Sequence, residues 1–238
     1  MEFLSAFFDT YGALLAQGTW DTIVMSLIST LFAYILGIPL GIAVVLTRSD
    51  GLHPHKVINM ILGWIVNIGR SIPFIILLVA IIPFTRFLVG TSLGIPGAIV
   101  PLVVSAAPFV ARMVEQSILE VDGSLVEAAQ SFGANTWQIV TKVYLSECLP
   151  SLIRGGAIVL ITLLGYSAMA GMVGAGGLGD IAVRYGYQRY NAEVMIATII
   201  ILVILVQIIQ TFFDRLALGL DKNCLLYTSP SPRDGLLS

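Results

Sequence analysis

Long runs of apolar residues alternate with short polar connections along most of this chain. A helix that crosses a bilayer needs about 20 consecutive, mostly apolar residues. Stretches that meet this requirement are predicted to be transmembrane helices at about residues 20–46, 57–82, 93–114, 149–172 and 192–213. Before the first span, residues 1–18 carry apolar and aromatic side chains at helical spacing, which predicts a short amphipathic or interfacial helix.

The composition indicates that lipid is the solvent for much of this surface. Hydrophobic residues make up 57% of the chain and charged residues 11%, and the mean hydropathy is +0.95. Soluble domains carry about 25% charged residues. The formal net charge is −2 and no basic stripe is present, so nothing points to nucleic acid. We therefore predict an all-α integral membrane protein with five transmembrane helices.

The distribution of Lys and Arg predicts how the chain is oriented in the membrane. Five spans place the two termini on opposite sides, and we first assume a cytoplasmic carboxyl terminus. The inner side would then hold Arg48, Lys56, Arg112, Lys142, Arg154, Arg215 and Lys222, and the outer side Arg86, Arg184 and Arg189. Because basic residues favour the cytoplasmic side, we predict an outer amino terminus and a cytoplasmic carboxyl terminus.

The longest connection, residues 115–148, is then cytoplasmic and has the pattern of ordered structure. Ser124 and Glu127 have the spacing of a capping box, in which the hydroxyl and the carboxylate satisfy backbone N–H groups at a helix start. A short helix is predicted to follow, with Gly133 as its C-terminal cap. A second helix is predicted to begin near Asn135 and to return to the membrane.

The chain changes character after Lys222. Residues 223–238 are polar and interrupted by proline, and they offer little apolar surface for packing. We predict that this tail is disordered and that it derives from a cloning or sequencing adapter, not from native coding sequence. The transmembrane domain is accordingly placed at residues 1–222.

Two nucleotide-binding patterns bear on function. A P-loop needs a lysine directly after glycine, and none of Lys56, Lys142 and Lys222 follows one. The chain is therefore not expected to hydrolyse ATP by that route. Residues 174–179 match the dinucleotide pattern G-x-G-x-x-G, but that pattern must follow a strand. Here it follows a predicted transmembrane helix, so we interpret the glycines as points of close backbone approach or bending.

A few polar side chains mark a candidate solute path. Arg70 lies among apolar residues, where a charge costs several kcal/mol unless it reaches water, a partner or a cavity. It either reaches helix-end carbonyls or, together with Ser71, lines the path, where a guanidinium can meet a carboxylate. Pro73 is predicted to free a backbone carbonyl nearby and to bend the helix. In the fourth predicted span, Tyr166 and Met169 are three residues apart and share a helix face. They form either a gate or ordinary helix packing.

Metal-binding patterns are weak. His53 and His55 flank Pro54 and form either a metal-binding pair or a solvated loop, and we favour the loop. Cys148 and Cys224 have no metal-ligand spacing. We therefore predict no metal site and no catalytic residue.

Part of the cytoplasmic connection carries a recognisable signature. The matching residues are Glu127, Ala128, Ala129 and Gly133, followed by Leu149 and Pro150. They resemble the E-A-A-x-x-x-G and L-P signature of ATP-binding cassette (ABC) importer permeases. In that family the segment is a coupling helix that docks into a groove on the ATP-hydrolysing subunit. The resemblance implies the same role here, and a solvated amphipathic helix is the alternative. The family's Pro-x-Gly before this helix is replaced by Asp122-Gly-Ser124.

The stretches that begin at Arg70 and at Gly165 narrow the resemblance to one group of ABC importer permeases. Over about residues 18–220 the chain is similar to the permeases of methionine uptake systems. This similarity implies a type I ABC importer permease fold with a cytoplasmic coupling helix, in a bacterial inner membrane. The implied partners are a second copy of the chain, two ATP-binding subunits and an external substrate-binding protein or lipoprotein. The resemblance places ATP and Mg on the ATPase subunits and implies no cofactor on this chain.

We therefore predict the permease subunit of an ATP-driven amino-acid importer, with methionine as the substrate, that works by alternating access. A stand-alone secondary carrier or channel is the first alternative. The predicted spans hold no Asp, Glu or His away from their ends, which argues against proton coupling, whereas sodium coupling stays open. An intramembrane enzyme or a structural subunit is the second alternative. An enzyme would need paired catalytic groups inside the spans, and the sequence offers no such pair.

Overall fold

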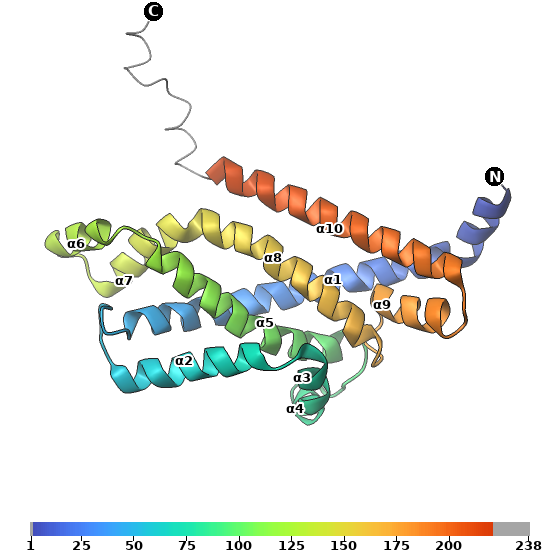
Figure 1. Ribbon diagram of the computed structural model, residues 1–238, viewed down its shortest axis with the longest axis horizontal. Coiled ribbons are helices and arrows are strands. Elements are labelled where there is room, and N and C mark those ends of the chain that lie inside the picture. The colour runs from blue at the N-terminus through green and yellow to red at the C-terminus, as the bar shows by residue number, and fades with distance from the viewer. Residues whose placement is uncertain (1, 221–238) are drawn as a thin grey trace, which may run out of the picture.

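The computed structural model describes residues 2–220, and all regular structure in this range is helical (Figure 1). The helices α1 (Glu2–Leu46), α5 (Gly94–Leu119) and α8 (Leu145–Gly171) pack together in the centre. On one side α2 (Lys56–Ser71) packs on α5, and on the other α10 (Ala192–Leu220) packs on α8. The predicted tail, 223–238, lies outside the described residues.

Short elements connect the long helices at the two ends of the bundle (Figure 1). They are α3 (Phe74–Ala80), α4 (Ile82–Val89), α6 (Gly123–Ser131), α7 (Thr136–Gln138), α9 (Gly177–Ile181) and two π-helical segments, Ile139–Tyr144 and Ala182–Tyr187. At one end, His53 Nε2 lies 2.7 Å from Thr136 Oγ1, which brings the α1–α2 turn next to α7. At the other, the Gly94 N–H donates to the Gly174 carbonyl at 2.9 Å.

The contact between α1 and α5 depends on two glycines of α1. A Cβ at Gly37 would lie 2.6 Å from Val110 Cβ, and one at Gly41 would lie 2.5 Å from the carbonyl oxygen of Ala111. Glycines four residues apart let membrane helices approach closely. Van der Waals packing then stabilises the contact, because there is no hydrophobic driving force between helices in lipid. This contact buries Val110 and Val114 completely and fixes α5 as the centre of the bundle.

Four of the predicted spans are present as long apolar helical segments: Ala6–Leu46, Gly94–Leu119, Thr136–Gly171 and Ala192–Gly219. The predicted amphipathic lead-in is not a separate helix, because α1 runs without a break from Glu2 to Leu46. Its Phe7 and Tyr11 pack against a cluster that includes Leu178. The start of α1 is thereby attached to the bundle.

The second predicted span, 57–82, is bent at Pro73 as predicted, and the bend is a complete break in the helix. The helix α2 ends at Ser71, and α3 leaves at an angle of 104°. The cause is Pro73, since the residue before a proline is pushed out of the helical region. Ile72 accordingly has φ −83° and ψ 123°. With 16 residues, α2 is about 24 Å long, shorter than a bilayer core of about 30 Å. The described residues thus contain four helices long enough to cross a membrane, or five spans if α2 and α3 count together as one.

Candidate functional site

The predicted coupling segment forms a short exposed helix, α6, with a different cap from the one expected. The Ser124–Glu127 capping box is wrong: the N-cap is Asp122, whose Oδ1 accepts from the Ser124 N–H at 2.9 Å. That bond lowers the pKa of the Asp122 carboxyl, so the cap is ionised at neutral pH. Asp122 therefore begins the helix in the stretch where this chain departs from the Pro-x-Gly of the ABC importers.

The end of α6 agrees with its prediction. Gly133 has φ +78°, in the left-handed region that favours glycine. The Gly133 N–H donates to the Gln130 carbonyl at 2.9 Å, and the Ala134 N–H donates to the Ala129 carbonyl at 3.0 Å. These two bonds form a Schellman motif, which satisfies the last carbonyls of the helix and turns the chain sharply.

The signature residues do not all face the same way. Glu127 and Ala128 are exposed, whereas Ala129 is half-buried and packs against the main core. Phe132, directly before the Gly133 turn, is 92% exposed, and Trp137, after the turn, is 73% exposed. The α6–α7 unit thus presents two large aromatic side chains, and a sequence signature of small residues did not point to them.

A second helix begins where it was predicted. Asn135 caps α7 through a full capping box, in which the Gln138 N–H donates to Asn135 Oδ1 and the Asn135 N–H donates to Gln138 Oε1, both at 2.9 Å. The helix continues through a π-helical segment into α8 and does not stop at Pro150. The α6–α7 turn is therefore capped on both sides, which makes it a well-defined unit.

The two histidines of the α1–α2 turn have separate structural partners. His53 contacts Thr136, and His55 Nδ1 accepts from the Ile58 N–H at 3.4 Å as the N-cap of α2. Within residues 2–220, no group of three or more His, Cys, Asp or Glu could hold a metal ion. The turn therefore joins α2 to the α6–α7 unit.

Two of the predicted path residues line a common cavity. This cavity has a volume of about 180 Å³ and lies between α2, α3, α5 and α8. Its lining consists of Gly69, Arg70, Ile72, Phe74, Ser105, Ala106, Phe109, Val159, Thr162, Leu163 and Tyr166. The Arg70 Cζ lies 6.0 Å from the centroid of the Phe109 ring. Phe74 and Tyr166 stack with centroids 4.5 Å apart and planes within 3°.

The break after α2 explains why an arginine is found inside an apolar stretch. Arg70 lies in the last turn of α2, at the negative end of the helix dipole, and its side chain is exposed. It therefore lies at the end of a helix and not inside a continuous one. The cavity combines one cation with aromatic faces and the Ser105 and Thr162 hydroxyls, groups suited to a small solute with a carboxylate and an apolar part.

The other two predicted path residues lie outside this cavity. The Ser71 hydroxyl donates to the Asn67 carbonyl at 2.7 Å, so it is engaged by its own helix. Met169 follows Tyr166 on one face of α8 and is 43% exposed in the single chain. The structure thus brings Arg70 and Tyr166 together, and leaves Ser71 and Met169 on the adjacent surface.

The glycine-rich stretch brings α9 against the end of α8. Gly174, Gly176 and Gly177 have positive φ angles of 90°, 82° and 80°. A Cβ at Gly179 would overlap the backbone of Ala168. The stretch follows a helix, as predicted, so it lacks the strand that a dinucleotide fingerprint requires. Its glycines serve close packing and turning of the backbone.

Comparison with known proteins identifies the family. Residues 37–222 match the family described as the inner membrane component of binding-protein-dependent transport systems. The chain belongs to this family. It is a multi-pass permease of the inner membrane, which confirms the predicted fold class and the resemblance to ABC importer permeases.

Individual members of this family are similar over 66% to 92% of the chain. The probable D-methionine transport system permease protein MetI of Vibrio cholerae is 49% identical over 220 residues, 92% of this chain and 98% of that protein. The D-methionine transport system permease protein MetI of Escherichia coli K12 is 52% identical over 158 residues, 66% of this chain and 73% of that protein.

Solved structures of family members share the same fold. A structure of the MetNI methionine ABC transporter in an inward-facing conformation matches with a TM-score of 0.88 and 49% identity, over 90% of this chain and 99% of that chain. An amino-acid ABC transporter solved with histidines matches at 19% identity and a TM-score of 0.68, which is a likeness of fold alone.

Proposed function

We propose that this chain is the permease subunit of an ATP-driven methionine importer. It would work as a homodimer with two separate ATPase subunits, which bind ATP and Mg, and with an external substrate-binding protein or lipoprotein. The observation that carries the proposal is the 49% identity to the MetNI methionine transporter, spread over 90% of the chain. The exposed α6 helix, with Glu127 and Ala128 on its open face, supports a surface for the ATPase.

The proposed mechanism is alternating access. The ATPases close on ATP and pull the two α6 helices, one from each copy, so that the permease halves rotate about the dimer axis. Methionine then passes between the bent α2–α3 span, α5, α8 and α10 of both copies. Arg70 would meet the substrate carboxylate, and the aromatic rings of the cavity would meet its apolar side chain. The permease itself performs no covalent chemistry.

Reconstitution in proteoliposomes tests this function. With the ATPase subunits and the binding protein present, ATP-dependent methionine uptake is expected, and the permease alone should transport nothing. Uptake by the permease alone would favour the secondary-carrier alternative. The binding constants of the cognate external protein across the amino acids test the substrate, and a clear preference for another amino acid would overturn methionine.

Cysteine labelling tests the proposed orientation, with the amino terminus outside and the carboxyl terminus in the cytoplasm. Pro54 and Tyr187 are both exposed and lie at opposite ends of the bundle. After Cys148 and Cys224 are replaced by serine, a cysteine at position 187 should react with an impermeant thiol reagent in intact cells. One at position 54 should react only after permeabilisation. The reverse pattern would invert the topology and place α6 on the outer side.

We also propose that Tyr166 and Met169 help to form a gate at the dimer axis. Met169 is 43% exposed in the single chain, so Met169→Ala removes little packing within it. The variant should seal the resting state poorly. Basal ATP hydrolysis without substrate should therefore rise several-fold, with the yield and melting temperature close to those of the wild type.

A matched control separates gating from packing. Met25 is completely buried, and truncating a core methionine costs about 2–5 kcal/mol. Met25→Ala should therefore lose stability and leave the basal ATPase rate per folded complex unchanged. If Met169→Ala behaves like Met25→Ala, Met169 is a packing residue and the gate lies elsewhere.

A further inference from the structure

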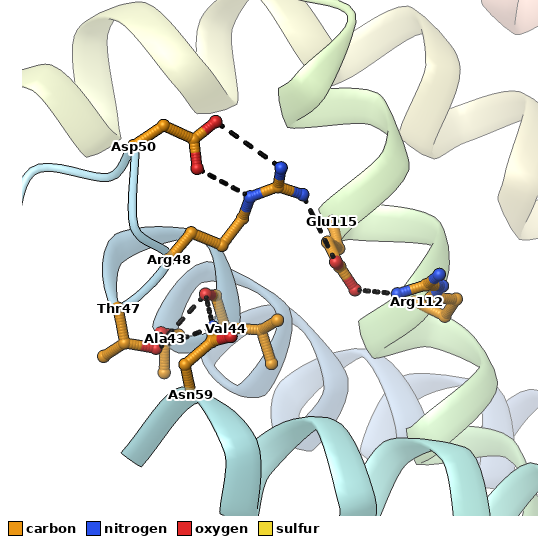
Figure 2. A network of polar contacts seen from close by, with 8 residues as sticks. All are labelled: Ala43, Val44, Thr47, Arg48, Asp50, Asn59, Arg112 and Glu115. Atoms are coloured by element: carbon orange, nitrogen blue, oxygen red, sulfur yellow. Dashed lines mark hydrogen bonds and ion pairs between the residues drawn. The ribbon is translucent and has the colours of Figure 1, made fainter. Parts of the chain in front are cut away.

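A buried carboxylate lies near the end of α5. Glu115 is only 5% exposed, and a buried charge is costly unless it is paired. Figure 2 shows it between two arginines: Arg112 Nη1 lies 2.7 Å from its Oε2, and Arg48 Nη1 lies 4.0 Å from its Oε1. The pair with Arg112 is internal to α5, whereas the pair with Arg48 joins α5 to the segment that follows α1.

Arg48 lies between two carboxylates. Its Nε lies 3.0 Å from Asp50 Oδ1, while the other branch of the guanidinium reaches toward Glu115 (Figure 2). This bond to Arg48 lowers the pKa of the Asp50 carboxyl, so Asp50 stays ionised. The planar fork of arginine suits such a bridge, which a lysine could not form in the same geometry. Arg48 therefore ties the α1–α2 turn to α5.

The α1–α2 turn is itself held together by side-chain bonds. The Asn59 Nδ2 of α2 donates to the Val44 carbonyl at 2.7 Å and to Thr47 Oγ1 at 3.2 Å (Figure 2). The Thr47 hydroxyl donates to the Ala43 carbonyl at 2.7 Å. The end of α1 and the start of α2 thus form one corner, and a force applied to Arg48 acts on both helices.

The α6 helix lies across a cavity from this bridge. Glu115 is four residues, one helical turn, from the end of α5 at Leu119, and α6 begins at Gly123. A cavity of about 330 Å³ is lined by Arg48 and Asp50 on one side and by Glu127 and Gln130 of α6 on the other. The chain joins α6 directly to the end of α5, and the half-buried Val126 and Ala129 of α6 pack against the main core.

We propose that Arg48 is a positioning residue for ATPase coupling. Its bridge between Asp50 and Glu115 makes the α1–α2 corner move together with the end of α5. Displacement of α6 pulls on α5, and the bridge passes that displacement to α1 and α2, which carry the bundle core and Arg70. This inference rests on the proposed function, because it needs an ATPase that moves α6.

Arg48 and Arg112 can be replaced separately in the assembled complex, so that each variant serves as the control for the other. In proteoliposomes, methionine uptake per ATP hydrolysed is compared for Arg48→Gln and Arg112→Gln, together with the melting temperature of each complex. Arg48→Gln should lower the uptake per ATP about tenfold, within the range typical of coupling between sites, with little loss of melting temperature. Arg112→Gln should lower the melting temperature more, because it removes the shorter pair of a buried carboxylate, and should leave the uptake per ATP close to that of the wild type.

Glu115→Gln tests the same bridge from the other side with almost unchanged shape. It should lower the uptake per ATP as Arg48→Gln does, and the double variant should give no lower uptake per ATP than either single one, because both remove the same Arg48–Glu115 pair. Glu115→Gln also removes the pair with Arg112, so it should lower the melting temperature as Arg112→Gln does. Three results would overturn the inference in a wild-type complex that imports. They are additive losses of uptake per ATP in the double variant, equal losses in Arg48→Gln and Arg112→Gln, and an uptake per ATP in Arg48→Gln equal to that of the wild type. A wild-type complex without ATP-dependent uptake would overturn the proposed function, and this inference with it.

Discussion

Gly133→Val is expected to reduce ATP-driven import by about tenfold or more while the permease still inserts in the membrane. Gly133 has φ +78°, and a Cβ there would meet nothing within 4 Å. Gly133→Val therefore acts through the backbone conformation alone. A left-handed backbone costs about 1–2 kcal/mol for an ordinary residue and more for a β-branched one. The Schellman turn should open and α6 should lose its fixed position. Uptake and ATPase stimulation by the binding protein measure the effect.

Gly133→Asn is the matched control for this prediction. Asparagine visits the left-handed region far more readily than valine, and the site has room for its side chain. Import should therefore stay near the wild-type level in Gly133→Asn. Normal uptake together with normal ATPase stimulation in Gly133→Val would show that the α6 turn does not transmit coupling.

The membrane spans could largely be predicted from the sequence, because a bilayer demands long apolar runs whatever the tertiary packing. The second span shows the limit of this reasoning. The run 57–82 is mostly apolar, and hydropathy does not show where a helix within such a run changes direction. The 104° bend follows from the backbone restriction that Pro73 imposes on Ile72. The proline was visible in the sequence, but whether it kinks a span or breaks it depends on the packing of α3 against α5 and α8.

The sequence predicted that a side chain caps the start of α6, but it named the wrong residue. Ser124 was expected to cap α6, because Glu127 follows it at the spacing of a capping box. In the structure the Asp122 carboxylate accepts from the Ser124 N–H, and this displaces the expected box. The real capping box is Asn135 with Gln138, an N-x-x-Q pattern that could have been found in the sequence.

The candidate sites show what a single sequence does not contain. Arg70 and Tyr166 could be named separately from their chemistry, but their common cavity depends on the α2–α3 break. Glu115 was missed altogether, because α5 was expected to end at about residue 114. The helix continues to Leu119 and carries the carboxylate into the core, next to Arg48 from a distant segment. Burial of one polar residue is a tertiary property that local pattern does not encode.

Gly179→Ala is expected to destabilise the permease itself. Here the added Cβ meets neighbouring atoms, whereas at Gly133 the Cβ has room and the backbone angle is unfavourable. Gly179 lies in α9 and is not among the positive-φ glycines, so an alanine strains no backbone angle. Its Cβ would, however, overlap the Cα and carbonyl oxygen of Ala168 in α8, and no side chain there can move aside. Overpacking of this kind costs about 1–3 kcal/mol and occasionally more. The detergent-extracted yield and the melting temperature should both fall.

Gly165→Ala provides the control, because it adds the same methyl group to α8 three residues before Ala168. A Cβ at Gly165 would meet nothing within 4 Å, so its stability should be unchanged or slightly raised. The α8–α9 contact lies beside Met169, so a complex that still assembles with Gly179→Ala should also show raised basal ATP hydrolysis. Equal melting temperatures in the two variants would mean that α9 does not lie as close to α8 as this packing requires. The glycines before it would then act in turning the chain alone.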